Sequence, residues 1–271
     1  MSYLRLRTVF TIGLVALALA AARHRAAAEA GDSWPDVARD AFNGRPLADG
    51  TGLIAIEMPA RAEDAAIVPV TFRTTLPAGD TRVLKTFTLV IDENPSPVAA
   101  AFKVGPGVTM ISTRVRVDSY TNVHAVAELS DGQLYVVQTY IKASGGCSAP
   151  MTKGDADKAK IGQMRFRQFA PSSAGIASGA REVQIMVRHP NNSGLQRDQV
   201  SLLYIPLLIV RELRVWQGDE LALEMDGGIS ISEDPNLRFT YMPNGAATFR
   251  AEAVDTDGRV FKGEWPADQA M

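Results

Sequence analysis

Short runs of apolar and β-branched residues, broken by turn sequences about every ten residues, most constrain what this chain can fold into. Between residues 52 and 142, seven such runs alternate or nearly alternate between apolar and polar residues, as strands with one buried face do. The breaks between them carry Gly, Pro, Asp and Asn, the residues that tight turns prefer. The runs are GLIAIEMP, AIVPVTFRT, RVLKTFTLVID, VAAAFKV, MISTRVRVD, NVHAVAELS and QLYVVQTYIK.

The same pattern resumes at residue 181 and continues almost to the end of the chain. REVQIMVRHP, LLYIPLLIVRELRVWQ, LALEMD, GGISIS, LRFTYMP, AATFRAEAVD and RVFKGEW are further candidate strands. Two hairpins are expected, around Gly218-Asp219 and Asp257-Gly258. Many short strands at this spacing are typical of antiparallel sandwiches. We therefore predict an all-β fold with two immunoglobulin-like β-sandwich domains, at residues 31–142 and 181–271.

Residues 143–180 differ in composition from both predicted domains. They are rich in Gly, Ser, Ala and Pro and lack a strand pattern, so we assign them to a cysteine-bearing arm and a flexible linker. Residues 155–169 could form a short helix within this segment. A second short helix is expected at residues 33–42, with Ser33 at its N-cap and Pro35 in its first turn.

Residues 1–30 have the pattern of a secretory signal peptide. Arg5 and Arg7 precede an apolar stretch of residues 8–22, and Ala28-Glu29-Ala30 offers a cleavage site. The stretch is shorter than the roughly 20 residues that a membrane-spanning helix needs. An uncleaved membrane anchor is the alternative. We expect an exported protein of the bacterial periplasm that has no membrane span after cleavage.

Charge and motif content exclude several classes of function. The chain has 28 Lys and Arg against 30 Asp and Glu, and loss of residues 1–30 leaves 24 against 29. This acidic balance argues against nucleic acid as a partner. Motifs for serine hydrolases, phosphate-binding loops and zinc peptidases are absent, and we expect no catalytic residues, cofactor or metal. His124 is expected to be a packing or surface residue and His189 to structure a turn.

Cys147 is the only cysteine in the chain, in the sequence ASGGCSA. In an oxidising compartment it cannot form an internal disulfide, so it must pair with another molecule, by a disulfide dimer for example, or remain a free thiol. A buried, inert thiol is the alternative. Gly145 and Gly146 are expected to make the arm flexible, and its small residues to leave the thiol exposed. Because no base lies beside Cys147 in the sequence, a carrier is favoured over a nucleophilic enzyme.

These features together resemble the SoxYZ carriers of bacterial sulfur oxidation, with both subunits fused in one chain. Gly145-Gly146-Cys147 is similar to the start of the Gly-Gly-Cys-Gly-Gly arm of SoxY, and HPNNSG (189–194) and SEDPNLRFTY (232–241) resemble SoxZ landmarks. The arm here continues as Ser148-Ala149-Pro150 and is internal to the chain. The chain is similar in particular to SoxYZ-like carriers associated with quinoprotein dehydrogenases.

The resemblance implies a periplasmic carrier that holds a small group, expected to be a sulfur species, covalently on Cys147. Its partners would be periplasmic redox enzymes, either sulfur-oxidation enzymes or a quinoprotein dehydrogenase with its cytochrome c. The alternatives are a non-catalytic adaptor of such a dehydrogenase, in which Cys147 is dispensable, and a copper carrier that uses Cys147 with Met and His side chains.

Overall fold

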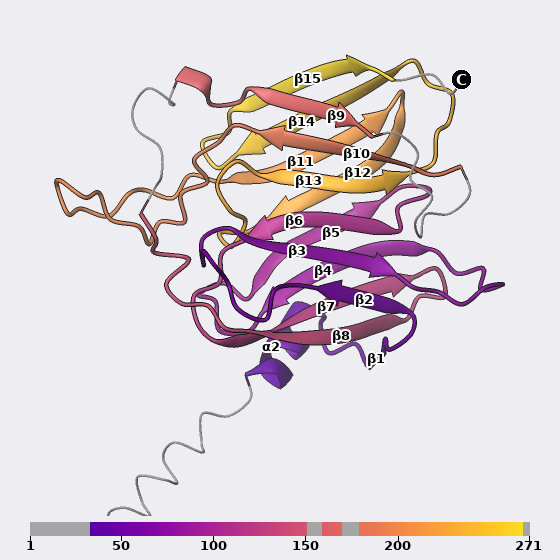
Figure 1. Ribbon diagram of the computed structural model, residues 1–271, viewed down its shortest axis with the longest axis horizontal. Coiled ribbons are helices and arrows are strands. Elements are labelled where there is room, and N and C mark those ends of the chain that lie inside the picture. The colour runs from indigo at the N-terminus through magenta and orange to yellow at the C-terminus, as the bar shows by residue number, and fades with distance from the viewer. Residues whose placement is uncertain (1–32, 151–158, 170–178, 268–271) are drawn as a thin grey trace, which may run out of the picture.

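The computed structural model describes residues 33–150, 159–169 and 179–267. The predicted signal peptide and two parts of the predicted linker, residues 151–158 and 170–178, lie outside these residues. The described part is almost entirely β, with one short helix, and confirms the all-β class (Figure 1). Its elements, in chain order, are α2 (Trp34–Ala41), β1 (Leu47–Asp49), β2 (Ile54–Glu57), β3 (Val68–Thr74), β4 (Leu84–Ile91), β5 (Val98–Val104), β6 (Met110–Val115), β7 (Thr121–Leu129), β8 (Leu134–Ile141), β9 (Met164–Gln168), β10 (Arg181–Val187), β11 (Val210–Gln217), β12 (Glu220–Gly227), β13 (Asn236–Tyr241), β14 (Thr248–Asp255) and β15 (Val260–Pro266).

The strands form two sheets, and each sheet runs through both sequence halves. Within the described residues, one sheet has nine strands in the order β1-β8-β7-β4-β5-β12-β11-β14-β15. The other has six, in the order β2-β3-β6-β13-β10-β9. Strands β1 to β8 form one immunoglobulin-like sandwich and β9 to β15 the other. The halves join edge to edge in both layers, through β5–β12 and β6–β13, as Figure 1 shows.

The core lies between the two layers and is continuous across the junction. Alternating residues of the strands point into it, as their sequence patterns predict. Phe72, Phe87 and Phe102 stack in the first half, with ring centroids 4.2 and 5.5 Å apart along the series. Phe239 and Phe249 are fully buried in the second half and belong to the same apolar cluster. Apolar burial therefore holds the halves together as well as stabilising each of them.

Most of the predicted strands and both predicted hairpins are confirmed, with specific exceptions. The expected helix within residues 155–169 is wrong, because Met164–Gln168 form β9, which pairs with β10 at the edge of the smaller sheet. Residues 202–209 form a loop before β11, and GGISIS is a turn with one isolated bridge at Ile231. Strand β1 was not predicted; its three residues pair in parallel with β8.

The predicted helix at the start is α2, which packs on the edge of the first half. Its apolar side, with Trp34 and Val37, contacts a small cluster that includes Phe42 and Val126. Ser33 precedes the helix, but its hydroxyl donates to Glu93 and does not cap the helix. Among the described residues, no helix has the length and apolar character to cross a membrane.

Candidate functional site

Cys147 lies in a loop, residues 143–149, that follows β8 and is bound along the segment after β6. We call it the cysteine loop. The backbone N–H of Gly145 donates to the Asp118 carbonyl at 2.8 Å, and that of Gly146 to the Val117 carbonyl at 3.0 Å. The Cys147 N–H donates to Asp118 Oδ1 at 3.2 Å. Three successive residues of the loop are thus tied to two residues of the first half.

Glycine is required at position 146 because two backbones approach each other there. A Cβ at Gly146 would lie 2.1 Å from the Ala65 carbonyl oxygen and 2.6 Å from that of Val117. At Gly145 a Cβ would meet nothing within 4 Å, but its φ of +75° favours glycine. In this structure the two glycines let the loop turn and pack closely.

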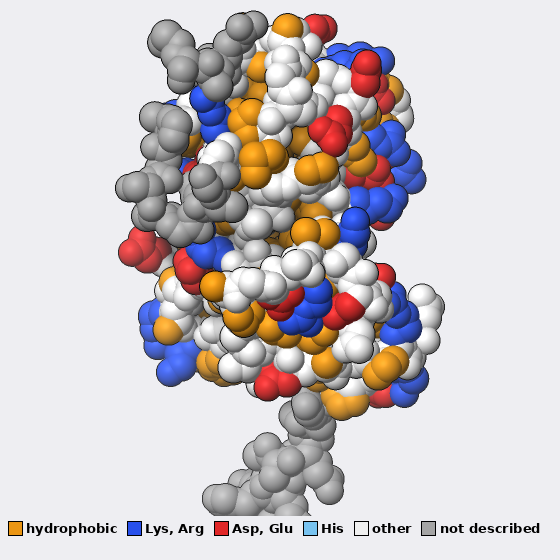
Figure 2. Space-filling view, turned by 90° about the vertical axis from the view of Figure 1, so that its right-hand side faces the viewer, with side chains coloured by type: hydrophobic (Ala, Val, Ile, Leu, Met, Phe, Trp, Pro, Cys, Tyr) orange, Lys and Arg blue, Asp and Glu red, His pale blue; other side chains and the backbone are white. Residues whose placement is uncertain are grey.

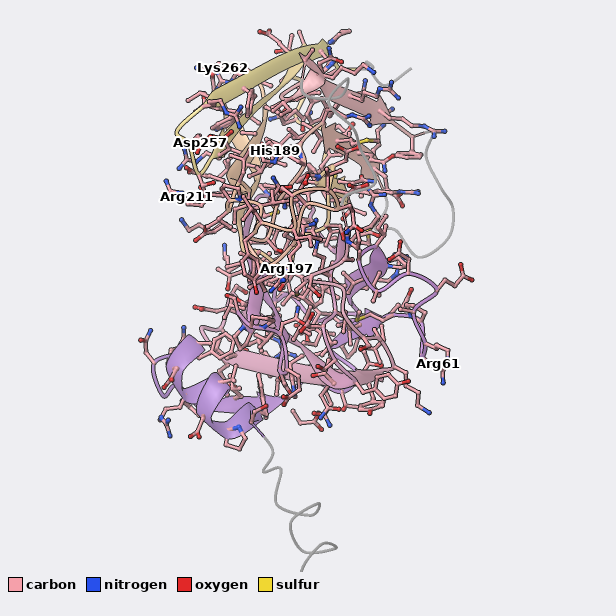
Figure 3. All side chains as sticks on the ribbon, turned by 90° about the vertical axis from the view of Figure 1, so that its left-hand side faces the viewer. Arg61, His189, Arg197, Arg211, Asp257 and Lys262 are labelled. Carbon is pink, nitrogen blue, oxygen red and sulfur yellow. The ribbon has the colours of Figure 1, made fainter. Side chains whose placement is uncertain are left out.

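The second half of the chain covers the cysteine loop from the other side. Residues 190–209, the cover loop, connect β10 to β11 and project from the molecule at the left of Figure 1. Ser193 Oγ donates to the Cys147 carbonyl, and Gln196 Nε2 donates to the Ala149 carbonyl at 3.1 Å. Figure 3 views the molecule from the left-hand side of Figure 1 and labels Arg197 in the cover loop and His189 just before it. Both halves therefore hold the loop that carries the cysteine.

The expectation of an exposed thiol on a flexible arm is wrong for this structure. Cys147 has 0% of its surface exposed. Burial, together with the negative charge of Asp118, raises the pKa of its thiol from 9.0 to about 12, whereas the nearby Arg116 lowers it. Small residues suit an exposed arm, but they equally allow the close backbone packing observed here. In the docked loop the thiol stays protonated at neutral pH and is a poor nucleophile.

Arg116 is a buried cation beside the cysteine loop that sequence analysis did not identify. Its Nη1 donates to the Ile231 carbonyl at 2.6 Å. Burial lowers the pKa of the guanidinium, and the negative charges of a Cys147 thiolate and of Glu233 raise it. The only sequence signal for this residue is its position between two valines in RVRVD. Strand alternation there predicts that its side chain lies on the same face as that of Arg114.

Neither histidine of the described residues is hydrogen-bonded to the cysteine loop. His124 is buried, pairs with Asp92 through Nε2 at 3.0 Å, and stacks on Trp34 with ring centroids 3.6 Å apart. His189 is also buried, which lowers its pKa, and its Nδ1 accepts the Asn191 N–H at 3.1 Å. The packing role expected for His124 and the turn role expected for His189 agree with these contacts.

Within residues 33–150, 159–169 and 179–267, no group of three or more His, Cys, Asp and Glu side chains is placed to hold a metal ion.

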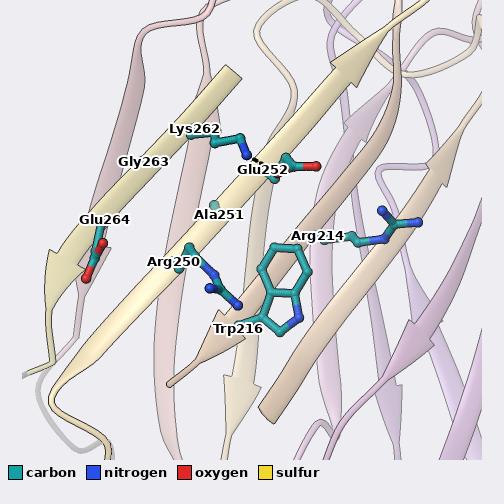
Figure 4. Close-up of a pocket in the computed structure, with 8 residues that line it drawn as sticks. All are labelled: Arg214, Trp216, Arg250, Ala251, Glu252, Lys262, Gly263 and Glu264. Atoms are coloured by element: carbon teal, nitrogen blue, oxygen red, sulfur yellow. Dashed lines mark ion pairs between the residues drawn. The ribbon is translucent and has the colours of Figure 1, made fainter. Parts of the chain in front are cut away.

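A shallow depression lies on the outer face of β11, β14 and β15, in the second half (Figure 4). The guanidinium of Arg250 lies over the Trp216 ring, 4.8 Å from its centroid. Lys262 Nζ pairs with Glu252 at 3.0 Å. On the face shown in Figure 2, acidic and basic side chains likewise lie near one another on both halves. No thiol lines the depression, so the cysteine loop remains the candidate site.

Comparisons with known proteins agree with the two-part organisation. The family model described as sulfur oxidation protein SoxY matches residues 38–147, and that described as sulphur oxidation protein SoxZ matches residues 172–266. A search of curated proteins found no match.

Solved structures with some similarity include the sulfur carrier protein SoxY from Chlorobium limicola f thiosulfatophilum. It is 28% identical, with 41% of this chain and 91% of that chain covered and a TM-score of 0.35. A superoxide reductase (neelaredoxin) from Ignicoccus hospitalis is 14% identical, with 33% and 78% covered and a TM-score of 0.29. The assignment rests on the two domain models, which follow one another along the sequence. The chain belongs to the SoxYZ-like carrier proteins of sulfur oxidation, with a SoxY domain and a SoxZ domain fused in one polypeptide.

Proposed function

We propose that Cys147 covalently holds a small sulfur group and that the protein presents this group to periplasmic redox enzymes of sulfur oxidation. The observation that carries the proposal is the position of the thiol. Cys147 is the last residue matched by the SoxY model and the only cysteine in the chain. It stands in a loop that connects two ordered halves, where a bound group can be shown or withdrawn by movement of the loop.

The surroundings of Cys147 favour carrying over catalysis. A cysteine nucleophile in an enzyme is activated by an adjacent base or by a lowered pKa. Among the described residues, two side chains hydrogen-bond the backbone of Cys147: Ser193 Oγ donates to its carbonyl, and Asp118 Oδ1 accepts its N–H. The pKa of the thiol is raised. The chain thus protects the sulfur, and the partner enzyme has to supply the reactive groups.

Loading and unloading require the cysteine loop to leave its docked position. Five hydrogen bonds hold it, from Gly145, Gly146, Cys147, Ser193 and Gln196. Each contributes about 0.5–1.5 kcal/mol net, so opening is within reach of the binding energy of a partner. In the open loop the thiol regains an ordinary pKa. Joining its thiolate to a second sulfur anion forms one S–S bond and releases two electrons, which the partner redox enzyme accepts.

The direct test is the mass of the protein purified from its natural host without reductant. We expect a mass increase on the Cys147 peptide that reductant removes, and no increase in Cys147→Ser. The variant should also lose sulfur-oxidation activity when it replaces the wild-type protein in the host. Unmodified thiol in the native protein, together with full activity of Cys147→Ser, would contradict the proposal and favour an adaptor role.

A further inference from the structure

Arg116 is buried more completely than its hydrogen bonds explain. Only 2% of its surface is exposed, and it follows directly on the end of β6. Its Nη1 donates to the Ile231 carbonyl, while its Nε is buried and has no hydrogen-bond partner among the described residues. Burying a charged group is costly unless it is paired, and a buried donor without a partner calls for an explanation.

The backbone around Arg116 is fixed by both halves of the molecule. The Arg116 N–H donates to the Ser230 carbonyl at 2.7 Å, and its carbonyl accepts from Asn94 Nδ2 at 2.8 Å. Asn94 Oδ1 accepts the N–H of Asp118 at 2.8 Å. The side chain therefore stands on a rigid support, and a binding group on such a support keeps its geometry when the cysteine loop moves.

The cysteine loop lies against this same segment. Gly146 is bonded to Val117 and Cys147 to Asp118, the two residues that follow Arg116. The guanidinium and Cys147 are close enough to interact electrostatically. The acidic groups that act on the pair are Asp118, which faces Cys147, and Glu233, which faces Arg116. No carboxylate of the described residues forms an ion pair with Arg116, so the cation is not neutralised directly.

We propose that Arg116 is the anion-recognising residue of the Cys147 site and stabilises negative charge on the group that Cys147 carries. The inference rests on the proposed carrier function and adds to it a recognition residue, Arg116, and a preference for anionic groups on Cys147. A guanidinium has several N–H donors in one plane and matches the oxygens of an oxyanion. Oxidised sulfur groups such as a sulfonate are of this kind. A neutral or cationic group on Cys147 leaves the spare donor of Arg116 without a partner.

The test compares three methanethiosulfonate reagents that differ in the charge of the group transferred. The sulfonatoethyl reagent is anionic, the methyl reagent neutral and the trimethylammonioethyl reagent cationic. In each case the Cys147 thiolate attacks the sulfenyl sulfur, a mixed disulfide forms, and methanesulfinate leaves with the electron pair of the broken S–S bond. Because the chemistry is common to all three, the ratio of anionic to cationic rates reports the electrostatics at Cys147.

We expect Arg116→Gln to lower this ratio about tenfold relative to wild type, the effect of one nearby charge at reduced dielectric. Arg116→Lys keeps the charge and should retain most of the ratio. Arg114→Gln is the matched control, since it removes an equal charge two residues away, where the side chain binds the Asp234 carbonyl at 3.0 Å. A ratio in Arg116→Gln that stays within twofold of both wild type and Arg114→Gln overturns the inference.

A second measurement needs only the wild-type protein, in case Arg116→Gln fails to fold. The three adducts are prepared in denaturant and refolded, and their thermal midpoints are compared. The anionic adduct should melt a few degrees above the cationic one, and an equal or reversed order overturns the inference. Neither result bears on the host experiment with Cys147→Ser, so failure of this inference is distinguishable from failure of the carrier function. If folded wild-type protein reacts with none of the reagents, the order of the thermal midpoints of the refolded adducts decides the inference.

Discussion

At the scale of single residues, Gly146 decides whether the thiol is hidden. Gly146→Ala places a Cβ against the Ala65 and Val117 carbonyls, and both are backbone atoms that cannot swing aside. We expect the cysteine loop to leave its docked position, so that Cys147 reacts with Ellman's reagent at least about tenfold faster, since each lost hydrogen bond is worth about 1 kcal/mol.

Gly145→Ala is the matched control for this effect. It carries the strain of a positive φ but meets no atom within 4 Å, so its reaction rate should rise much less. Equal rates for Gly146→Ala and wild type would show that the docked loop does not limit access to the thiol.

The raised pKa of Cys147 makes folding stability depend on alkaline pH. Below pH 9 the thiol is protonated in both the folded and the unfolded chain, and its full contribution is present. Between pH 9.0 and about 12 only the unfolded chain releases the proton, so stability falls as pH rises. The difference in unfolding free energy between wild type and Cys147→Ser, from urea titrations, should be constant between pH 7 and 8. Above pH 9 it should change by up to about 1.4 kcal/mol per pH unit. A difference that stays constant to pH 10.5 would mean that the thiol is not buried in solution.

At the scale of elements, the strands could be predicted because each has one buried face. Alternation in β3, with Val68, Val70 and Phe72 buried, is a local signal that no distant contact overrides. Strand β1, which pairs in parallel with β8, has only three residues, and these are too few to show an alternating pattern. Residues 202–209 are apolar yet lie in a loop, and apolar character alone does not distinguish a strand from an exposed loop.

The candidate site was predictable only in part, for a related reason. Cys147 and its glycines stand out by composition. Its burial depends on Ser193 and Gln196, which come from the other half of the chain, and on the carbonyl of Ala65. Contacts between segments so distant in sequence leave no periodic trace. The same holds for Arg116, whose importance follows from its buried Nε, which has no hydrogen-bond partner among the described residues.

Helix α2 offers a prediction at the element scale. Trp34 covers the buried His124 with nearly parallel rings and joins the small apolar cluster at the edge of the first half. Trp34→Ala should lower the free energy of unfolding by about 2 kcal/mol, less than for a fully buried aromatic residue. Trp34→Phe keeps a stacked ring and should cost less than half as much. Urea titrations measure both, and an unchanged midpoint for Trp34→Ala would show that α2 adds nothing to stability.

At the scale of the whole molecule, the two halves form one continuous sandwich. Sequence patterns could not reveal this, because β5, β6, β12 and β13 alternate in the same way whether their edges are paired or free. In the structure these edges are paired, with Phe102 opposite Met225 and Ile111 opposite Phe239. An exposed strand edge is a liability, and each half covers two edges of the other. The covalent connection at residues 151–158 is therefore not what keeps the halves together.

This arrangement predicts that the halves associate without the connection. Residues 33–150 and 159–271, co-expressed as separate chains, should elute together and sediment as a 1:1 complex.

Gly105→Ala should weaken the complex at least about tenfold, because its Cβ would lie 2.1 Å from the Leu221 carbonyl across the junction, and overpacking typically costs about 1–3 kcal/mol. Gly132→Ala is the control, since a Cβ there meets nothing within 4 Å, and its positive φ adds backbone strain that Gly105→Ala does not have. Halves that sediment separately at micromolar concentration would contradict the continuous sheets, and equal affinities of the two variants would contradict the close packing at Gly105. Association would also mean that the docked position of Cys147, which depends on Ser193 and Gln196, survives the cut, so the thiol should stay as slow toward Ellman's reagent as in the intact chain.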